Sequence, residues 1–243
     1  MSTEQAPSPG LGRTLAVQVA DRLARRVLVG VNWTLVEGPD GCGLAQTPAR
    51  DGAGCHPLGE AGSYAGRGLK ALAELVESHN RFEAAIGWAA INAHFNHRDL
   101  TGPATNGLDL LAQTDGPGRS VVVGRFPDLE RSLPGALVIE REPREGEYPE
   151  SAAAELLPGA SRVGITASAL FNGSAERLIA LARGARIALI GPSTPLAPQL
   201  HDLGIAILAG MVVDRADEAA RVVAEAGAVK ALKRCGRFVA LVR

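Results

Sequence analysis

Short apolar strands alternate with helical segments from Ser120 to the end of the chain. The expected strands cover residues 120–124, 135–140, 162–165, 187–190, 205–209 and 236–242. The expected helices lie between them, at residues 128–132, 152–157, 174–182, 198–203 and 217–226. Such an alternation folds into a parallel or mostly parallel sheet with right-handed crossovers. The second half of the chain is therefore predicted to be an α/β, Rossmann-like, doubly wound domain.

The first half of the chain has a mixed pattern. Apolar residues at four-residue intervals, Leu15, Val19, Leu23 and Val27, predict an amphipathic helix over residues 13–29. The elements expected next are a β-hairpin at residues 30–47 that turns at 37–41, a glycine-rich loop at 48–68, and two helices with apolar faces that begin at Leu69 and Phe82. The second of these helices consists almost wholly of small apolar residues, so we expect it to be buried.

Glycine and proline mark the passage between the two halves. Residues 100–119 are rich in both, which is typical of a linker, although residues 108–112 could form a helical turn. The first twelve residues are polar and lack the basic start and apolar run of a signal peptide, so we expect them to be disordered. The predicted organisation is a disordered segment at residues 1–12, a first domain at 13–114 and a second domain at 115–243, with the boundary near Asp115.

Composition excludes several classes of partner. The 25 basic residues nearly cancel the 26 acidic ones, so no positive field attracts nucleic acid or an anionic membrane. No segment approaches the roughly 20 apolar residues of a membrane span. Cys42, Cys55 and Cys235 show no CxxC spacing, which argues against a secreted disulfide scaffold and favours a reducing cytoplasm. We expect a cytoplasmic protein with a small-molecule partner, and the sequence leaves a homo-oligomer open.

Two of the expected strands run directly into small polar residues. The carboxyl ends of parallel strands meet at one edge of a sheet, where doubly wound folds bind their ligands. Hydroxyl and amide groups there are suited to a carboxylate, a phosphate or a metal-bound oxygen. The second loop is equally consistent with a rigid turn, because two prolines fix its backbone. The candidate ligand-binding residues after the two strands are Thr166, Ser168, Asn172, Gly191, Ser193 and Thr194.

The ends of the first two strands of this half bear on the cofactor. The first ends in Gly124-Arg-Phe-Pro127, which is not the GxGxxG of a dinucleotide fold and disfavours NAD. The second ends in Glu140, close to where such folds place the carboxylate that binds ribose hydroxyls. Glu140 is therefore a candidate ligand-binding residue, and a solvated glutamate at the end of a strand is an equally good interpretation.

Asparagine and histidine end the buried helix of the first half. Asn92 and Asn96 share one helix face, and His94 and His97 can converge on one ion. Two histidines are half of a transition-metal site. Cys55 and His56 are possible further ligands, although adjacent residues seldom both reach one ion. No Ser-His-Asp order, nucleophile elbow, HExxH motif or P-loop is present, so no catalytic residue is assigned.

Several segments together resemble the family described as "Putative heavy-metal chelation". They are residues 166–177, 191–198 and 209–214, the helix at 86–93, and Glu140 with the proline and tyrosine-proline positions that follow it. The resemblance covers nearly the whole chain after the first dozen residues. It implies an α+β, enolase N-terminal-like domain before the Rossmann-like domain, with an active-site cleft between them. By position, the implied lining of this cleft is Asn92, Thr166, Asn172, Ser193 and Thr194.

The resemblance also implies a function: making or handling a small metal-chelating molecule, such as a metallophore, pterin, flavin or siderophore, by condensation or hydrolysis. One alternative is a non-catalytic protein that binds a transition metal or metallophore through His94 and His97, with Cys55 or His56 as further ligands. Another is an enzyme similar to S-adenosylmethionine-dependent methyltransferases, which rests on Gly124 and Glu140. The sequence thus leaves open whether a transition metal is the cofactor.

Overall fold

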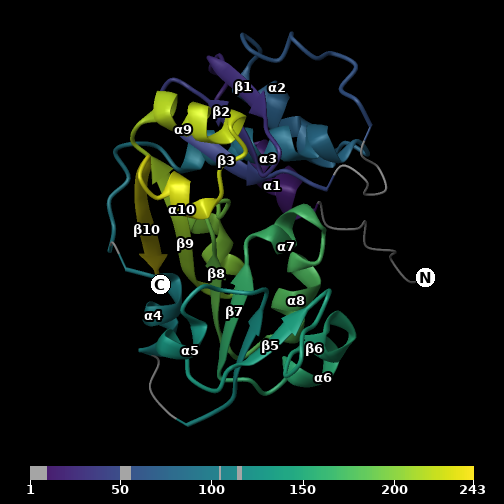
Figure 1. The fold of residues 1–243 in the computed structure, drawn as a ribbon, viewed down its shortest axis with the longest axis vertical. Coiled ribbons are helices and arrows are strands. Elements are labelled where there is room, and N and C mark those ends of the chain that lie inside the picture. Colours follow the sequence, from purple (N-terminus) through teal and green to yellow (C-terminus); the bar gives the residue numbers. More distant parts are fainter. Residues whose placement is uncertain (1–9, 50–55, 104, 114–116) are drawn as a thin grey trace, which may run out of the picture.

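The computed structural model describes residues 10–49, 56–103, 105–113 and 117–243. Within these ranges the chain forms a three-stranded antiparallel sheet and a seven-stranded, mostly parallel sheet. Figure 1 shows the small sheet at the top and the large sheet below it. The predicted α/β fold, a doubly wound and mostly parallel sheet preceded by a smaller α+β unit, is confirmed.

The elements follow the predicted order closely. The strands are β1 (Arg26–Val29), β2 (Trp33–Glu37), β3 (Cys42–Gln46), β4 (Ser120–Val123), β5 (Leu137–Glu140), β6 (Tyr148–Pro149), β7 (Arg162–Thr166), β8 (Arg186–Ile190), β9 (Ile205–Val213) and β10 (Gly236–Val242). The α-helices are α1 (Leu11–Ala16), α2 (Leu69–Ala73), α3 (Arg81–Phe95), α4 (Gly107–Ala112), α5 (Leu129–Ser132), α6 (Ala153–Leu156), α7 (Ser168–Phe171), α8 (Ala175–Leu181), α9 (Ala216–Ala224) and α10 (Val229–Leu232). The 3-10 helices are η1 (Glu74–Glu77), η2 (Glu150–Ala152) and η3 (Pro198–Leu203).

The large sheet reverses its direction of growth between two neighbouring strands. Its order is β10-β9-β8-β7-β4-β5-β6, and only β10 runs antiparallel to its neighbour. From β4 the chain adds β5 and β6 on one side, and it then returns to add β7, β8 and β9 on the other. The topological switch point therefore lies between β4 and β7, and ligands of open α/β sheets bind at the carboxyl ends of the strands beside it.

The small sheet lies between a helix from the first half of the chain and a helix from the second half. Helix α3 packs against β2 and β3, and α9 packs against β1 and β2. All five residues of β2 are buried, as expected for a strand covered on both faces. Gly43 lets α3 approach closely, because a Cβ there would lie 2.0 Å from the Ala89 carbonyl oxygen.

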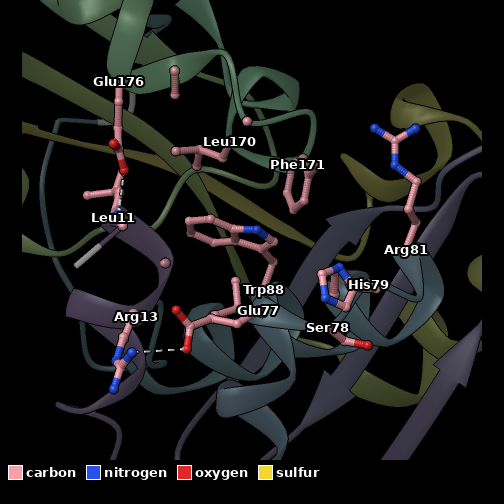
Figure 2. Close-up of a pocket in the computed structure, with 16 residues that line it drawn as sticks. Leu11, Arg13, Glu77, Ser78, His79, Arg81, Trp88, Leu170, Phe171 and Glu176 are labelled. Carbon is pink, nitrogen blue, oxygen red and sulfur yellow. Dashed lines mark hydrogen bonds and ion pairs between the residues drawn. The ribbon is translucent and has the colours of Figure 1, made fainter. Parts of the chain in front are cut away.

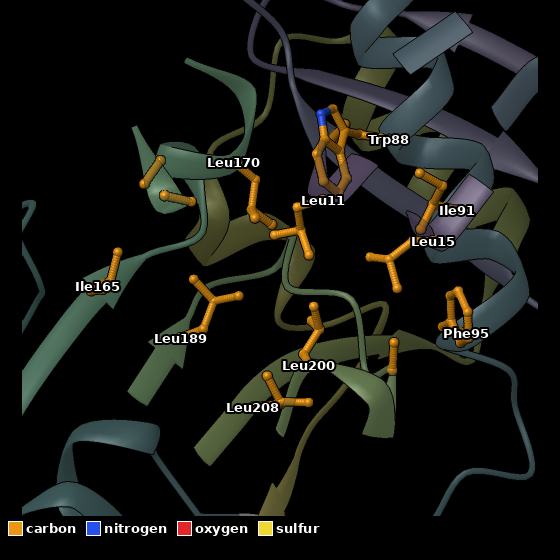
Figure 3. Packing of buried hydrophobic residues seen from close by; sticks show 14 of the residues in the cluster. Leu11, Leu15, Trp88, Ile91, Phe95, Ile165, Leu170, Leu189, Leu200 and Leu208 are labelled. Carbon is orange, nitrogen blue, oxygen red and sulfur yellow. The ribbon is translucent and has the colours of Figure 1, made fainter. Parts of the chain in front are cut away.

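One hydrophobic cluster continues from the first half of the chain into the second. It includes Leu15 of α1 and Ile91 of α3, together with Ile165 and Leu189 of the large sheet. Figure 3 shows these side chains facing one common interior. A second cluster joins β2 and β3 to α9 and β9. The two halves are thus interlocked, and both contribute to the same cores.

Several predicted elements differ from the structure. The helix predicted at residues 13–29 is wrong: α1 ends at Ala16, and Val27 pairs with Val36 as part of β1. The apolar residues of that pattern do not share a face, since Val19 is 3% exposed and Leu23 is 68% exposed. Helix α1 also begins inside the segment predicted to be disordered. Residues 1–9, Cys55 and the predicted boundary at Asp115 lie outside the described residues.

Helices α7 and α10 and strand β6 were not predicted, because each is too short to show a period. Helix α4 confirms the helical turn considered at residues 108–112, and it packs against β7, β8 and β9. Among the helices of the described ranges, none combines the length and apolar character needed to cross a membrane.

Candidate functional site

Two cavities lie beside the switch point of the large sheet. One, of about 420 Å³, lies between α3, the segment after β3, and α7. The other, of about 90 Å³, lies at the carboxyl ends of β4, β5 and β7. Arg141, Ser168 and Asn172 line both. We refer to the two cavities together as the cleft.

The loop after β7 presents a hydroxyl and an amide to both cavities. Ser168 is the first residue of α7, and its hydroxyl donates to Thr166 Oγ1 at 3.1 Å. Asn172 Oδ1 accepts hydrogen bonds from the Ser174 main-chain N–H at 2.9 Å and the Ser174 hydroxyl at 2.6 Å. These bonds fix the Asn172 side chain ahead of α8. The Asn172 amide nitrogen has no partner among the described residues, so it can donate to a ligand in the cleft.

Glu140 holds the backbone around the smaller cavity. Its two carboxylate oxygens accept hydrogen bonds from the main-chain N–H groups of Arg125, at 2.9 Å, and Arg141, at 3.1 Å. Glu140 therefore positions the ends of β4 and β5. The Arg141 guanidinium lies 3.4 Å from Glu150, and both side chains are largely exposed.

Thr166 closes most of the crevice at the switch point. Gly124 has a φ of 101°, and a Cβ at this position would lie 2.7 Å from Thr166 Cγ2. The remaining space of about 90 Å³ is well below the roughly 300–1,000 Å³ of common ligand pockets. The crevice therefore gives little support to the methyltransferase-like alternative, in which Gly124 and Glu140 would hold a nucleoside.

The larger cavity is also lined by an arginine and two aromatic rings. Arg81 and Trp88 come from α3 and Phe171 from α7. The Trp88 and Phe171 rings meet edge to face, with centroids 5.6 Å apart. These residues and Arg141 were not predicted as site residues, because the sequence signal for a ligand site in an α/β sheet is small polar residues directly after strands. Arg81 and Trp88 are seven residues apart, or about two helical turns. This spacing places them on one helix face, and it is the sequence signal that could have indicated a shared site.

Asn92, Ser193 and Thr194 lie elsewhere than predicted. All three are at most 3% exposed, and none lines either cavity of the cleft. Asn92 Nδ2 donates to the carbonyl oxygens of Leu44, at 2.7 Å, and Ser193, at 2.9 Å. The proline-flanked turn thus packs its backbone under α3, which matches the interpretation as a rigid turn. Gly191 also lies outside both cavities, and its N–H donates to the Ala209 carbonyl oxygen at 3.0 Å.

The histidines predicted to bind a metal, His94 and His97, are not joined by further ligands among the described residues. Among the described residues, no group of three or more His, Cys, Asp and Glu side chains is placed to hold a metal ion. Burial lowers the pKa of His94, and the neighbouring His97 lowers it further. Burial raises the pKa of the Cys42 thiol, and His56 is exposed. Two imidazoles are half of the four-ligand set typical of a structural zinc site, so the described side chains do not fit a resident metal.

An arginine–glutamate pair fixes the loops that follow β4 and β5, outside the cleft. Arg125 Nη2 lies 2.7 Å from Glu147 Oε2, and Arg125 Nε donates to Oε1 of the same carboxylate at 2.9 Å. The Arg125 side chain lowers the pKa of Glu147 to about 2, assisted by the main-chain N–H of Arg144. This bidentate pair connects the segment after β4 to the segment after β5.

Comparisons with known proteins agree with this fold. The DUF4213 model matches residues 13–95 and the DUF364 model matches residues 106–242, and both are described as "Putative heavy-metal chelation". A DUF364-family protein of unknown function from Desulfitobacterium hafniense has a solved structure with 30% identity and a TM-score of 0.84, over 96% of this chain and 98% of that chain.

A second solved structure is less similar in sequence. It is a DUF364-family protein of unknown function from Pyrococcus horikoshii, with 22% identity and a TM-score of 0.80 over 96% of this chain and 98% of that chain, and it shows the fold alone. A search of the curated proteins finds no match. The DUF364 match alone spans more than half of the chain. The chain therefore belongs to the DUF364 family, described as "Putative heavy-metal chelation".

Proposed function

We propose that the chain binds a small metal-chelating organic molecule in the cleft. The observation that carries the proposal is that one guanidinium, one hydroxyl and one amide, from Arg141, Ser168 and Asn172, line both cavities beside the switch point. Open α/β sheets bind ligands at this place. The family description supplies the metal-chelating character of the molecule.

The chemistry of the cleft suits an oxygen-rich ligand. Arg141 and Asn172 offer N–H donors, and Ser168 offers a hydroxyl, to carboxylate, carbonyl or phenolate oxygens. Molecules that chelate metals commonly carry such oxygens. Condensation or hydrolysis of the bound molecule would need an acid or a base, and Glu150 is the cleft carboxylate that main-chain N–H groups do not hold. Glu150 is the residue we propose for that role.

Direct binding of a metal ion by protein side chains has weaker support. His94 and His97 are not joined by a third ligand among the described residues. In our proposal any metal therefore reaches the protein as part of the chelating molecule.

Asn172→Asp tests the proposal with little disturbance of the fold. Aspartate keeps the Oδ1 acceptor for Ser174 and replaces the free amide donor by a carboxylate that repels an anionic ligand. We expect small molecules released by denaturing the freshly purified protein to include one metal-chelating compound, detected by mass spectrometry. Its yield should fall at least tenfold in Asn172→Asp, because the variant both loses a donor and repels an anionic ligand.

The matched control is Glu145→Gln, an exposed residue that lines neither cavity. It should release the compound in the same yield as the natural protein. Equal yields from the natural protein and Asn172→Asp, or no compound enriched over an unrelated protein prepared in the same way, would contradict the proposal.

A further inference from the structure

A third cavity, of about 350 Å³, lies beneath the first helix, and we refer to it as the α1 cavity. It is bounded by α1, the turn between η1 and α3, α7 and the start of α8, as Figure 2 shows. Arg81, Ala84, Trp88 and Phe171 line both this cavity and the larger cavity of the cleft. The two spaces are therefore neighbours that share an aromatic wall.

The indole nitrogen of Trp88 is a donor without an acceptor. Trp88 is only 5% exposed, and its Nε1 forms no hydrogen bond with the described residues. The nitrogen of Trp33 is also unpartnered but is enclosed by protein atoms, whereas that of Trp88 is not. Figure 2 shows the Trp88 ring at the centre of the cavity, with its nitrogen on the side of Phe171. An indole N–H only donates, and this one opens onto the cavity, so it can donate to an acceptor on a ligand there.

The charges around the α1 cavity are separated. Glu77 lies 3.8 Å from Arg13, and Glu176 accepts a hydrogen bond of 2.5 Å from the Leu11 N–H. The Arg81 side chain forms no ion pair or hydrogen bond with another described residue. Figure 2 shows Arg81 on the opposite side of the cavity from Glu176 and Arg13. The uncompensated positive charge therefore lies at the end that adjoins the cleft.

The arginine and the indole lie on one face of α3 and line the same cavity. Seven residues separate them, about 10 Å along the helix axis. Helix side chains tilt toward the N-terminus, so Trp88 leans toward the turn of α3 that carries Arg81, and both side chains line the same cavity. Leu11, Leu170 and Phe171 supply apolar surface beside the indole ring.

We propose that the α1 cavity is a second ligand subsite, which takes an aromatic carboxylate. The ring of the ligand lies against Trp88, Leu170 and Phe171, and its carboxylate accepts hydrogen bonds from the Trp88 N–H and the Arg81 guanidinium. The inference rests on the proposed function, because the subsite extends the cleft and would hold the carboxylate-bearing end of the same molecule.

Benzoate and its neutral analogue benzamide test the subsite in the full chain. In a Trp33→Phe background, Trp88 is the only tryptophan, so its fluorescence reports binding at this position. We expect benzoate to change the Trp88 emission and to bind at least tenfold more tightly than benzamide. Arg81→Gln should reduce this preference to threefold or less, and the control Arg177→Gln, an exposed arginine outside the cavity, should keep it.

Calorimetry on Trp88→Phe gives a second test, because phenylalanine keeps an aromatic ring and removes the N–H. Benzoate should bind three- to tenfold more weakly to this variant. Equal affinity for benzoate and benzamide in the natural protein, or an unchanged preference in Arg81→Gln, would overturn the subsite.

Asn172→Asp separates this result from the test of the proposed function. A benzoate preference that persists in Asn172→Asp supports the subsite, even if the natural protein releases no chelating compound. A preference that is lost in Asn172→Asp and kept in Arg81→Gln would place the carboxylate at the other end of the cleft and would refute the subsite.

Discussion

Asn96 joins the two halves of the molecule through a single buried side chain. Its amide nitrogen donates to the carbonyl oxygens of Thr194, at 3.0 Å, and Met211, at 3.1 Å, and its oxygen accepts from the Leu196 N–H at 2.8 Å. Asn92, one helical turn earlier, donates to one carbonyl oxygen in each half, those of Leu44 and Ser193, and its own oxygen is unpartnered. Sequence spacing correctly placed both asparagines on one helix face. It could not show that backbone carbonyls, rather than a ligand, are their partners.

Asn96→Ala should lower the free energy of unfolding by about 3 kcal/mol, because three buried main-chain groups lose their partner at roughly 1 kcal/mol each. Denaturant unfolding measures the change. The control is Gln199→Ala, which removes an exposed hydrogen bond to Gln18 and should cost less than about 0.5 kcal/mol. If Asn96→Ala lowered the free energy of unfolding by less than about 1 kcal/mol, these hydrogen bonds would not be what holds the two halves of the molecule together.

The carboxylate of Glu147 should make stability depend on pH. Its pKa in the folded chain is about 2, against an ordinary value of 4.5, chiefly because of Arg125. A lowered pKa means that the pair stabilises the fold above the ordinary value and loses this effect as the pH falls toward 2. The melting temperature of the natural protein should exceed that of Glu147→Gln at pH 7, and the difference should shrink between about pH 5 and pH 2. A difference that is constant down to pH 2 would refute the assignment, and Glu145→Gln serves as the control.

At the scale of elements, the sequence predicted the large sheet better than the small domain. Every strand expected after Ser120 is present, because buried parallel strands are short apolar runs bounded by turns. The first predicted helix is wrong, because its apolar residues belong to different elements: Leu15 to α1 and Val27 to β1. Helix α3 and the hairpin before it were predicted correctly, since both have strong local signals.

The contact between β3 and α3 depends on a residue without a side chain. Gly43→Ala would place a methyl group 2.0 Å from the Ala89 carbonyl oxygen and 2.2 Å from the Ala93 nitrogen. These are backbone atoms, so the helix itself would have to move, and we expect a loss of about 3 kcal/mol or more in unfolding free energy. Gly59→Ala, which meets nothing within 4 Å, should change stability by less than about 0.5 kcal/mol. Similar stability of the two variants would contradict this packing.

At the scale of the whole molecule, the C-terminal segment closes the structure over the N-terminal sheet. Helix α9 covers β1 and β2, and Arg26 of β1 pairs with Asp217 of α9 at 2.6 Å. Figure 1 shows α9 beside the small sheet, whose strands lie 170 residues or more earlier in the chain. Such long-range pairing leaves no local signal in the sequence.

The lack of a local signal for long-range contacts also explains which part of the site could be predicted. Ser168 and Asn172 follow a strand, and their position in the cleft follows from the topology of the sheet alone. Arg81 and Trp88 come from the other half of the chain. Their place in the cleft depends on how the two halves dock, which hydrogen bonds from Asn92 and Asn96 fix at separations of about a hundred residues.

The central claim is that the cleft holds a small organic molecule. A crystal structure of protein purified without extended dialysis tests it most directly. We predict electron density for an organic molecule within hydrogen-bond distance of Arg141, Ser168 and Asn172. An organic molecule bound at another place, with only water in the cleft, would contradict the account.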